Sequence, residues 1–320
     1  MHASDKAIII PVASGKGGVG KSIFSASLAI SLANRGEDTV AVDLDLGGSN
    51  LHTYLGMPNN NPGVGDFLKQ RLRNLQELIV PTGLKNLRFL PGDGKTPFMA
   101  NIPTAQRFQL LDELQKIRAR YVIVDLGAGT SVNTMNFFGL ANNGIIVTTL
   151  DTPALMNALV FLRNFMFANI LSLTRENQTI KRQLLDTYRQ SANRENLSAE
   201  AVFDFIASHD EPLALRIKNR CRQFTPRFIY NMGDQPEEIR IAERIGATLQ
   251  KTLSMQAIPL GLIYYDDAVR RAVRKNEVFL PAHPASRYAK CLAGIVSRLT
   301  QTSQASTNME TLLAEAKKNI

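Results

Sequence analysis

Short apolar runs alternate with longer segments of helical periodicity along most of this chain. The runs have the length of buried strands and are bounded by glycine, proline or charged residues. They predict strands at residues 7–13, 39–43, 87–90, 121–125, 144–149, 228–231 and 255–260. Between them, apolar side chains recur at helical spacing, as at Phe108, Leu111 and Leu114. This spacing predicts helices over residues 22–35, 104–118, 153–167, 236–253, 266–275 and 285–299.

The order of these elements predicts the fold class. Strands that alternate with helices favour an α/β fold, with a mostly parallel sheet and helices on both faces. Residues from about 170 to 224 break the alternation, because they carry mixed charges and helical patches but few β-branched side chains. We therefore expect one domain over residues 1–303 with a helical insertion at about 170–224. A polar linker and a short amphipathic tail helix should occupy residues 304–320.

A glycine-rich stretch lies between the first predicted strand and the first predicted helix. It has the form G-x-x-x-x-G-K-S, and this strand–loop–helix setting is typical of a phosphate-binding loop. Glycines let backbone N–H groups point inward, and the helix N-terminus adds partial positive charge. We expect Lys21 to reach the β- and γ-phosphates of a nucleotide and the Ser22 hydroxyl to ligate Mg²⁺. The expected phosphate-binding residues are Gly15, Lys16, Gly17, Gly18, Val19, Gly20, Lys21, Ser22 and Ile23.

Aspartates follow two other predicted strands at their carboxyl ends. Asp43 and Asp45 end the second strand, and Asp125 ends the strand at 121–125, with Gly127 and Gly129 directly after it. Ligands of parallel sheets bind at the carboxyl ends of the strands, so these carboxylates should converge on one Mg²⁺–nucleotide. The glycines after Asp125 would let backbone N–H groups approach a γ-phosphate.

Composition narrows the classes of function. The chain has 320 residues, 44% of them hydrophobic, which is enough for a full core. Its two cysteines form no C-x-x-C motif, so a disulfide framework, a zinc site and an iron–sulfur site are all disfavoured. We expect no signal peptide and no apolar run long enough to span a bilayer. A formal net charge of +9 favours anionic partners, and a bound nucleotide accounts for part of that preference.

The motifs together resemble one family. The sequence at 16–22 resembles the deviant Walker A motif of the MinD/ParA ATPases, a branch of the signal-recognition-particle, MinD and BioD class of P-loop proteins. The sequence at 43–45 is similar to their switch I motif, and that at 125–129 to their Walker B and switch II motif. The Gly-Ala-Gly variant at 127–129 looks most like the FlhG/FleN flagellar-number regulators.

The resemblance implies roles for individual residues. Lys16 would cross an ATP-sandwich homodimer to the partner's phosphates, while Lys21 and Ser22 act within their own subunit. Asp45 would position the attacking water, and Asp43 and Asp125 would organise Mg²⁺ through water. The family's later nucleotide-contacting and interface motifs fall on this chain at Asp151, Asn231 and Pro259, with Asn231 reading the adenine edge.

Each assignment has a structural alternative. Lys16 alone would be a solvated loop lysine, and Asp45 would be a helix N-cap or a turn residue. Asn231 would equally be a turn former before Gly233. The histidines form no spaced cluster, so we expect no metal–histidine site.

Three surface features leave the partner open. Basic stretches at 216–227 and 270–275 are compatible with non-specific DNA binding, although a solvated charged face is the favoured interpretation. The tail helix carries Met309, Leu312 and Leu313 on one face, and membrane attachment, packing against the protein and disorder all remain open for it. The insertion at 170–224 is the expected site of partner specificity, because it lies outside the nucleotide core.

We therefore expect a cytoplasmic ATPase, at most peripheral to the inner face of the membrane. ATP would drive dimerisation, and a protein partner would accelerate slow hydrolysis, so that the chain acts as a spatial regulator of division, flagella or chromosome and cargo position. The alternatives are a ParA-type DNA-binding partition ATPase and a metabolic or iron–sulfur-carrier ATPase of the same class. Missing paired cysteines disfavour the iron–sulfur carrier, and Lys16 disfavours an amide-forming enzyme.

Overall fold

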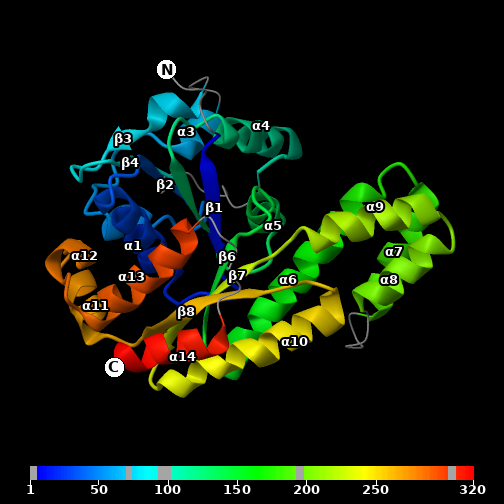
Figure 1. Ribbon diagram of the computed structural model, residues 1–320. Coiled ribbons are helices and arrows are strands. Elements are labelled where there is room, and N and C mark those ends of the chain that lie inside the picture. Colours follow the sequence, from blue (N-terminus) through cyan, green and yellow to red (C-terminus); the bar gives the residue numbers. More distant parts are fainter. Residues whose placement is uncertain (1–5, 70–73, 93–101, 192–197, 302–307) are drawn as a thin grey trace.

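A computed structural model describes residues 6–69, 74–92, 102–191, 198–301 and 308–320. Within these ranges one sheet runs through the molecule (Figure 1). Its strands lie in the order β3 (Val80–Pro81), β4 (Leu87–Leu90), β2 (Thr39–Leu44), β5 (Tyr121–Leu126), β1 (Ile8–Ala13), β6 (Ile145–Thr149), β7 (Arg227–Gly233) and β8 (Ile258–Tyr264). All neighbouring strands pair in parallel except β3, which runs antiparallel to β4. The predicted α/β fold class is confirmed.

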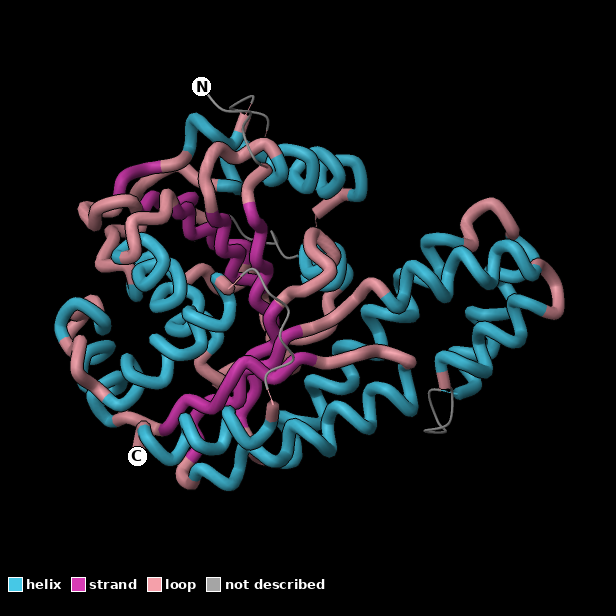
Figure 2. Tube along the Cα trace, in the orientation of Figure 1, coloured by secondary structure: helices cyan, strands magenta, loops and turns pink. Residues whose placement is uncertain are grey.

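Helices connect the strands and cover both faces of the sheet (Figures 1 and 2). Those of the first half of the chain are α1 (Lys21–Asn34), α2 (Leu51–Tyr54), α3 (Val64–Leu68), η1 (Leu75–Leu78), α4 (Thr104–Gln115), α5 (Val132–Phe138) and α6 (Thr152–Leu173). Those of the second half are α7 (Gln178–Ser191), α8 (Ala199–Ala207), α9 (Glu211–Arg222), η2 (Pro236–Arg240), α10 (Ile241–Leu253), α11 (Asp267–Arg274), α12 (Phe279–Ala282), α13 (Arg287–Thr300) and α14 (Met309–Lys318).

The central strands are buried on both faces. Every residue of β2 and β5 is buried, which is why both strands read as continuous apolar runs without alternation. Helix α1 packs on these strands and against α13, while α5 and α6 cover β1 and β6 from the other face. The small side chains Ser25, Ala26 and Ala29 let α1 lie close to the sheet.

The segment predicted as a helical insertion contains α7, α8 and α9, which extend from the far end of α6 (Figure 1). Helix α7 packs back on α6, where the Tyr188 ring stacks on Phe167 and its hydroxyl donates to Asn164 Oδ1 at 2.6 Å. The side chains of Ile180 and Leu184 are buried beneath the helix. Helices α7, α8 and α9 therefore form a helical arm with a packed base.

The sequence analysis expected no apolar run long enough to span a bilayer. Helix α6 contradicts this expectation, because its length and composition would suffice for a span. The helix has 22 residues and is apolar enough for a span, yet half of its most apolar window is buried inside the protein. Phe165 contacts Phe138 and Phe224 edge to face, so α6 joins β6, α5 and the base of the arm. The predicted helix at 153–167 was too short because its apolar packing continues to Leu173.

The tail helix α14 packs against the protein in this structure. Its buried residues Leu312 and Ala316 lie over η2 and β8, and the Ala316 carbonyl accepts a hydrogen bond from Tyr264 Oη at 2.8 Å. Glu315 pairs with Arg298, and Lys317 pairs with Glu237 at 3.3 Å. Of the three open interpretations of this segment, the structure adopts packing.

Candidate nucleotide-binding site

The loop between β1 and α1 arches over the carboxyl edge of the sheet. Gly18 and Gly20 have φ values of 82° and 85°, a left-handed conformation that side-chain-bearing residues rarely adopt. Gly15 lies so close to α6 that a Cβ atom there would sit 2.2 Å from the backbone carbon of Asn157. The Ser14 hydroxyl donates to the Lys16 carbonyl at 3.0 Å. These contacts fix the conformation of the loop at the N-terminus of α1, where backbone amides can meet an anion.

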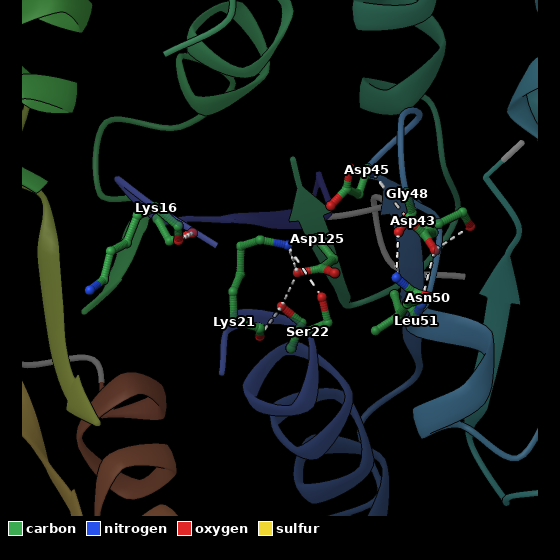
Figure 3. Close-up of polar contacts among 12 residues, drawn as sticks. Lys16, Lys21, Ser22, Asp43, Asp45, Gly48, Asn50, Leu51 and Asp125 are labelled. Carbon is green, nitrogen blue, oxygen red and sulfur yellow. Dashed lines mark hydrogen bonds and ion pairs between the residues drawn. The ribbon is translucent and has the colours of Figure 1, made fainter. Parts of the chain in front are cut away.

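Lys21 lies below this arch in a buried ion pair (Figure 3). Its Nζ atom is 2.9 Å from Asp125 Oδ1 and 3.3 Å from Ser22 Oγ. Asp125 Oδ1 also accepts a hydrogen bond from the Ser25 hydroxyl at 2.8 Å, whereas Oδ2 is buried with no hydrogen-bond partner among the described residues. A buried carboxylate oxygen without a partner is costly, so this oxygen marks a place for a cation, a water molecule or a phosphate-bound group.

Asp43 stands beside Asp125, because the two residues are register partners at the ends of β2 and β5. Its carboxylate accepts hydrogen bonds from the Asp45 amide at 3.0 Å, the Leu51 amide at 3.1 Å and the Ser49 hydroxyl at 2.6 Å. Burial, and then the negative charge of Asp125, raise the pKa of Asp43 to about 7. The loop after β2 is thus folded around one carboxylate.

Asp45 is half-buried and lies against the loop that follows β5. A Cβ atom on Gly127 would sit 3.3 Å from Asp45 Oδ1, so the two loops touch at this point. Burial raises the pKa of Asp45, and the positive charge of Lys21 opposes that rise. The structure therefore brings Lys21, Ser22, Asp43, Asp45 and Asp125 together from three loops that are far apart in sequence (Figure 3).

Lys16 points away from this cluster (Figure 3). Its Nζ atom pairs with Asp151 Oδ1 at 2.9 Å, and the side chains are 36% and 47% exposed. Asp151 is the N-cap of α6, since its carboxylate accepts from the Ala154 amide at 3.0 Å. Hydrogen bonds from Thr149 and then from Lys16 lower the pKa of Asp151 to about 2. Lys16 is thus held at the surface by Asp151 and does not join the buried cluster around Lys21.

A pocket of about 220 Å³ lies beside the loop at the carboxyl ends of β7 and β8. Asn231 is buried in its wall, and Ile23 lines it from α1. The remaining wall includes Tyr264, Tyr265, Asp266, Val269, Arg270 and Tyr288. A mostly apolar, aromatic-lined space next to a phosphate-binding loop suits a flat heterocyclic base.

Pro259 does not belong to this site, which corrects its prediction as a nucleotide contact. It pairs with Phe228 near the amino end of β8, whereas the loop lies at the carboxyl end. Strand β8 continues past residue 260, where the apolar pattern predicts its end, through Gly261 to Tyr264, so Pro259 lies away from the carboxyl edge. Tyr264, Tyr265 and Asp266, which the sequence analysis missed, occupy the place expected of Pro259.

The oxygen atoms of this site suit Mg²⁺ by their chemistry. Ser22 Oγ and the carboxylates of Asp43, Asp45 and Asp125 are hard oxygen donors of the kind that this ion prefers. Among the described residues no three His, Cys, Asp or Glu side chains gather as a metal cage. The donor set and the unpartnered Asp125 Oδ2 therefore fit an ion that nucleotide phosphates and water would help to hold.

Comparison with known proteins agrees with this architecture. A ParA family model, described as the NUBPL iron-transfer P-loop NTPase, matches residues 6–173. The septum site-determining protein MinD of Helicobacter pylori is 33% identical over 153 residues, which cover 48% of this chain and 56% of that protein. The flagellum site-determining protein YlxH of the same organism is 31% identical over 185 residues, covering 55% of this chain and 62% of that protein.

The chain spans about half the length of the named relatives that it matches. A solved structure of the septum site-determining protein MinD from Pyrococcus horikoshii, complexed with Mg-ADP, superimposes with a TM-score of 0.62 and 19% identity. It covers 94% of this chain and 98% of that one, and at this identity it supports the fold alone. Since the family model covers more than half of the chain, the predicted membership is confirmed: the protein belongs to the ParA family of P-loop NTPases, which includes MinD-like proteins.

Proposed function

We propose that this chain binds Mg²⁺–ATP, forms a homodimer in the ATP state and hydrolyses ATP slowly to ADP and phosphate. The observation that carries the proposal is the convergence of Lys21, Ser22, Asp43, Asp45 and Asp125 under one glycine-rich arch. Phosphoryl transfer needs little from a protein beyond positioning and charge neutralisation, and these residues supply both. The residues of the phosphate-binding loop, from Gly15 to Ile23, would bind the phosphates and the edge of the base.

Each residue has a task in hydrolysis. Lys21 would leave Asp125 to neutralise the β- and γ-phosphates, and Asp45 would orient a water molecule. That water forms a bond to the γ-phosphorus as the bond to the β–γ bridging oxygen breaks, so ADP keeps the electron pair and the water proton passes to phosphate. When bound, Mg²⁺ adds positive charge where the phosphates carry negative charge. The backbone amide of Gly127 would face the γ-phosphate, whereas the amide of Gly129 donates to the Ser14 carbonyl at 3.0 Å and ties the two loops together.

Lys16 is the residue that makes turnover depend on a second copy. It lies at the surface in an exposed ion pair, and exposed pairs contribute little to stability, so exchanging Asp151 for a partner's phosphate costs little. A lysine supplied from the other subunit would add positive charge as the γ-phosphate separates. The side chains of Val132 on α5 and Met156 on α6 are exposed. In the proposed dimer the partner subunit would cover them.

Relatives named as site-determining proteins support a role for this switch in positioning a cellular structure. We place it in the cytoplasm, where ATP is available and the free, buried thiols Cys221 and Cys291 stay reduced. The arm of α7, α8 and α9 is the proposed site for a stimulating partner. A chain without the arm should bind ATP but lose that partner's stimulation, and unchanged stimulation would place the partner elsewhere.

Two substitutions test the proposal. Lys16→Ala should bind ATP normally but fail to dimerise with ATP and lose turnover by at least about tenfold. Asp45→Ala should bind Mg²⁺–ATP and accumulate as an ATP-bound dimer. Nucleotide titration, light scattering after size exclusion and phosphate release measure these three properties. The exposed α10 variant Lys251→Ala is the control.

Two results would contradict the proposed roles. Wild-type turnover and dimerisation in Lys16→Ala would contradict the proposal that Lys16 acts on the partner subunit's nucleotide. Normal hydrolysis in Asp45→Ala would remove Asp45 from the catalytic set.

A further inference from the structure

Asn231 belongs to two parts of the site at once. It lies two residues before the end of β7, with its side chain buried, only 3% exposed, in the wall of the base-sized pocket. Its Nδ2 atom also donates a hydrogen bond to the Val19 carbonyl at 2.8 Å, inside the phosphate-binding loop. The two residues are 212 positions apart in the chain, so this bond ties the far half of the sheet to the loop.

The loop is shaped around this side chain. Gly20 has no Cβ, and a Cβ placed there would sit 2.3 Å from Asn231 Nδ2. Gly20 is also the N-cap of α1, so Asn231 lies against the point where the loop becomes the helix that begins with Lys21. Any residue larger than glycine at this position would push the amide away from the Val19 carbonyl.

The backbone after Asn231 is in a sparsely populated conformation. Met232 has a φ of 60°, in the left-handed region that a side-chain-bearing residue rarely adopts. The pairing of β7 with β8 shifts register between Asn231 and Gly233 at the same place. The strand end is therefore bent where its side chain meets the loop.

We propose that Asn231 is a positioning residue for the phosphate-binding loop. Its amide holds the Val19 carbonyl outward, so that the loop amides and Lys21 face the phosphates before ATP arrives. A base in the pocket would then rest on the same side chain that supports the loop. This inference rests on the proposed nucleotide-binding function, and it differs from the adenine-reading role expected for Asn231 from the sequence.

The two roles predict different ligand dependence. A residue that reads only the base matters for ATP but has no effect on tripolyphosphate, which carries the phosphates without a base. A residue that shapes the loop matters equally for both ligands. Because removing the donor leaves the buried Val19 carbonyl without its partner, the expected loss is about tenfold in affinity.

The experiment measures Mg²⁺–ATP and Mg²⁺–tripolyphosphate binding by calorimetry for the wild type, Asn231→Ala and Asn231→Asp. Asn231→Asp keeps the shape of the side chain and removes the donor, so it answers the question if the alanine variant is unstable. Both variants should lose about tenfold toward each ligand, with the two losses equal. Val269→Ala, in the same pocket wall, is the matched control and should weaken ATP binding alone.

The outcomes separate this inference from the proposed function. Weakened ATP binding with unchanged tripolyphosphate binding in both Asn231 variants would overturn the positioning role. A wild-type chain that binds neither ligand would overturn the nucleotide-binding function itself.

Discussion

At the scale of single residues, the site is built from side chains that neutralise or oppose one another. Asp43 and Asp125 are register partners on neighbouring strands, and only Asp125 has a lysine beside it. Asp43 is instead surrounded by three neutral donors, which do not offset its burial and the charge of Asp125. As a consequence, the Asp43 carboxyl group releases its proton near neutral pH.

The pKa of about 7 for Asp43 predicts how stability depends on pH. Between pH 4 and 7 the folded state keeps a proton that the unfolded state has released, so stability falls as pH rises and levels off above 7. We expect the free energy of unfolding without Mg²⁺ and nucleotide to fall by up to about 4 kcal/mol from this group. Urea unfolding across this range should show a shallower fall for Asp43→Asn. The exposed aspartate variant Asp204→Asn should keep the wild-type slope, and parallel slopes in all three proteins would refute the assignment.

At the scale of elements, the phosphate-binding loop depends on a helix from the middle of the chain. Gly15 lies against the backbone of Asn157, and Asp151 at the start of the same helix holds Lys16. Helix α6 then runs 22 residues to the base of the arm. The loop and the arm are therefore in contact with opposite ends of one packed helix.

Glycine substitutions test the contact between the loop and α6. Gly15→Ala would place its methyl group 2.2 Å from a backbone carbon, so the loop or the helix must move. We expect a stability loss of about 1–3 kcal/mol and ATP affinity reduced by more than about tenfold. Gly17 has no atom within 4 Å of such a methyl group, so Gly17→Ala should change stability by less than about 0.5 kcal/mol. Equal stabilities for the two variants, measured by urea unfolding, would show that the contact is unimportant.

At the scale of the whole molecule, helix α14 lies beside the edge of the sheet. Strand β8 lies at the edge, where an unpaired strand is open to association, and α14 packs beside it over η2. Tyr264 links this helix to the base-sized pocket, because its ring lines the pocket and its hydroxyl donates to Ala316. Tail and site are thus parts of one packed unit.

A charged side chain buried beneath α14 should detach this helix from the rest of the protein. Leu312 is 2% exposed, so Leu312→Asp places a carboxylate in the apolar contact of α14 with η2 and β8, where burial of a charge is costly. We expect α14 to detach from η2 and β8, so that its amides lose protection from hydrogen exchange while those of β1, β5 and β6 keep theirs. Thr311→Asp, exposed on the same helix, should leave exchange unchanged. Full protection of α14 in Leu312→Asp would show that its docking does not depend on this side chain.

Features that depend on local pattern could be predicted from the amino-acid sequence alone. Apolar runs and helical spacing predicted the α/β fold, and the glycine-rich loop with Asp43, Asp45 and Asp125 predicted a nucleotide site, because strand ends on one parallel sheet share one edge. Continuous burial made the central strands the easiest to place. The edge strand β8 was harder, since Pro259 and Gly261 interrupt its apolar run.

Contacts between side chains that are distant in sequence, by contrast, depend on how the elements pack. The pairing of Lys16 with Asp151, the bond from Asn231 to Val19 and the packing of α14 join residues that no local spacing relates. The same holds for α6, whose composition suits a membrane and whose neighbours make it a core helix. Local pattern sets the conformation of each segment, whereas packing selects its partners, and here the partners decide which residues support the phosphate-binding loop.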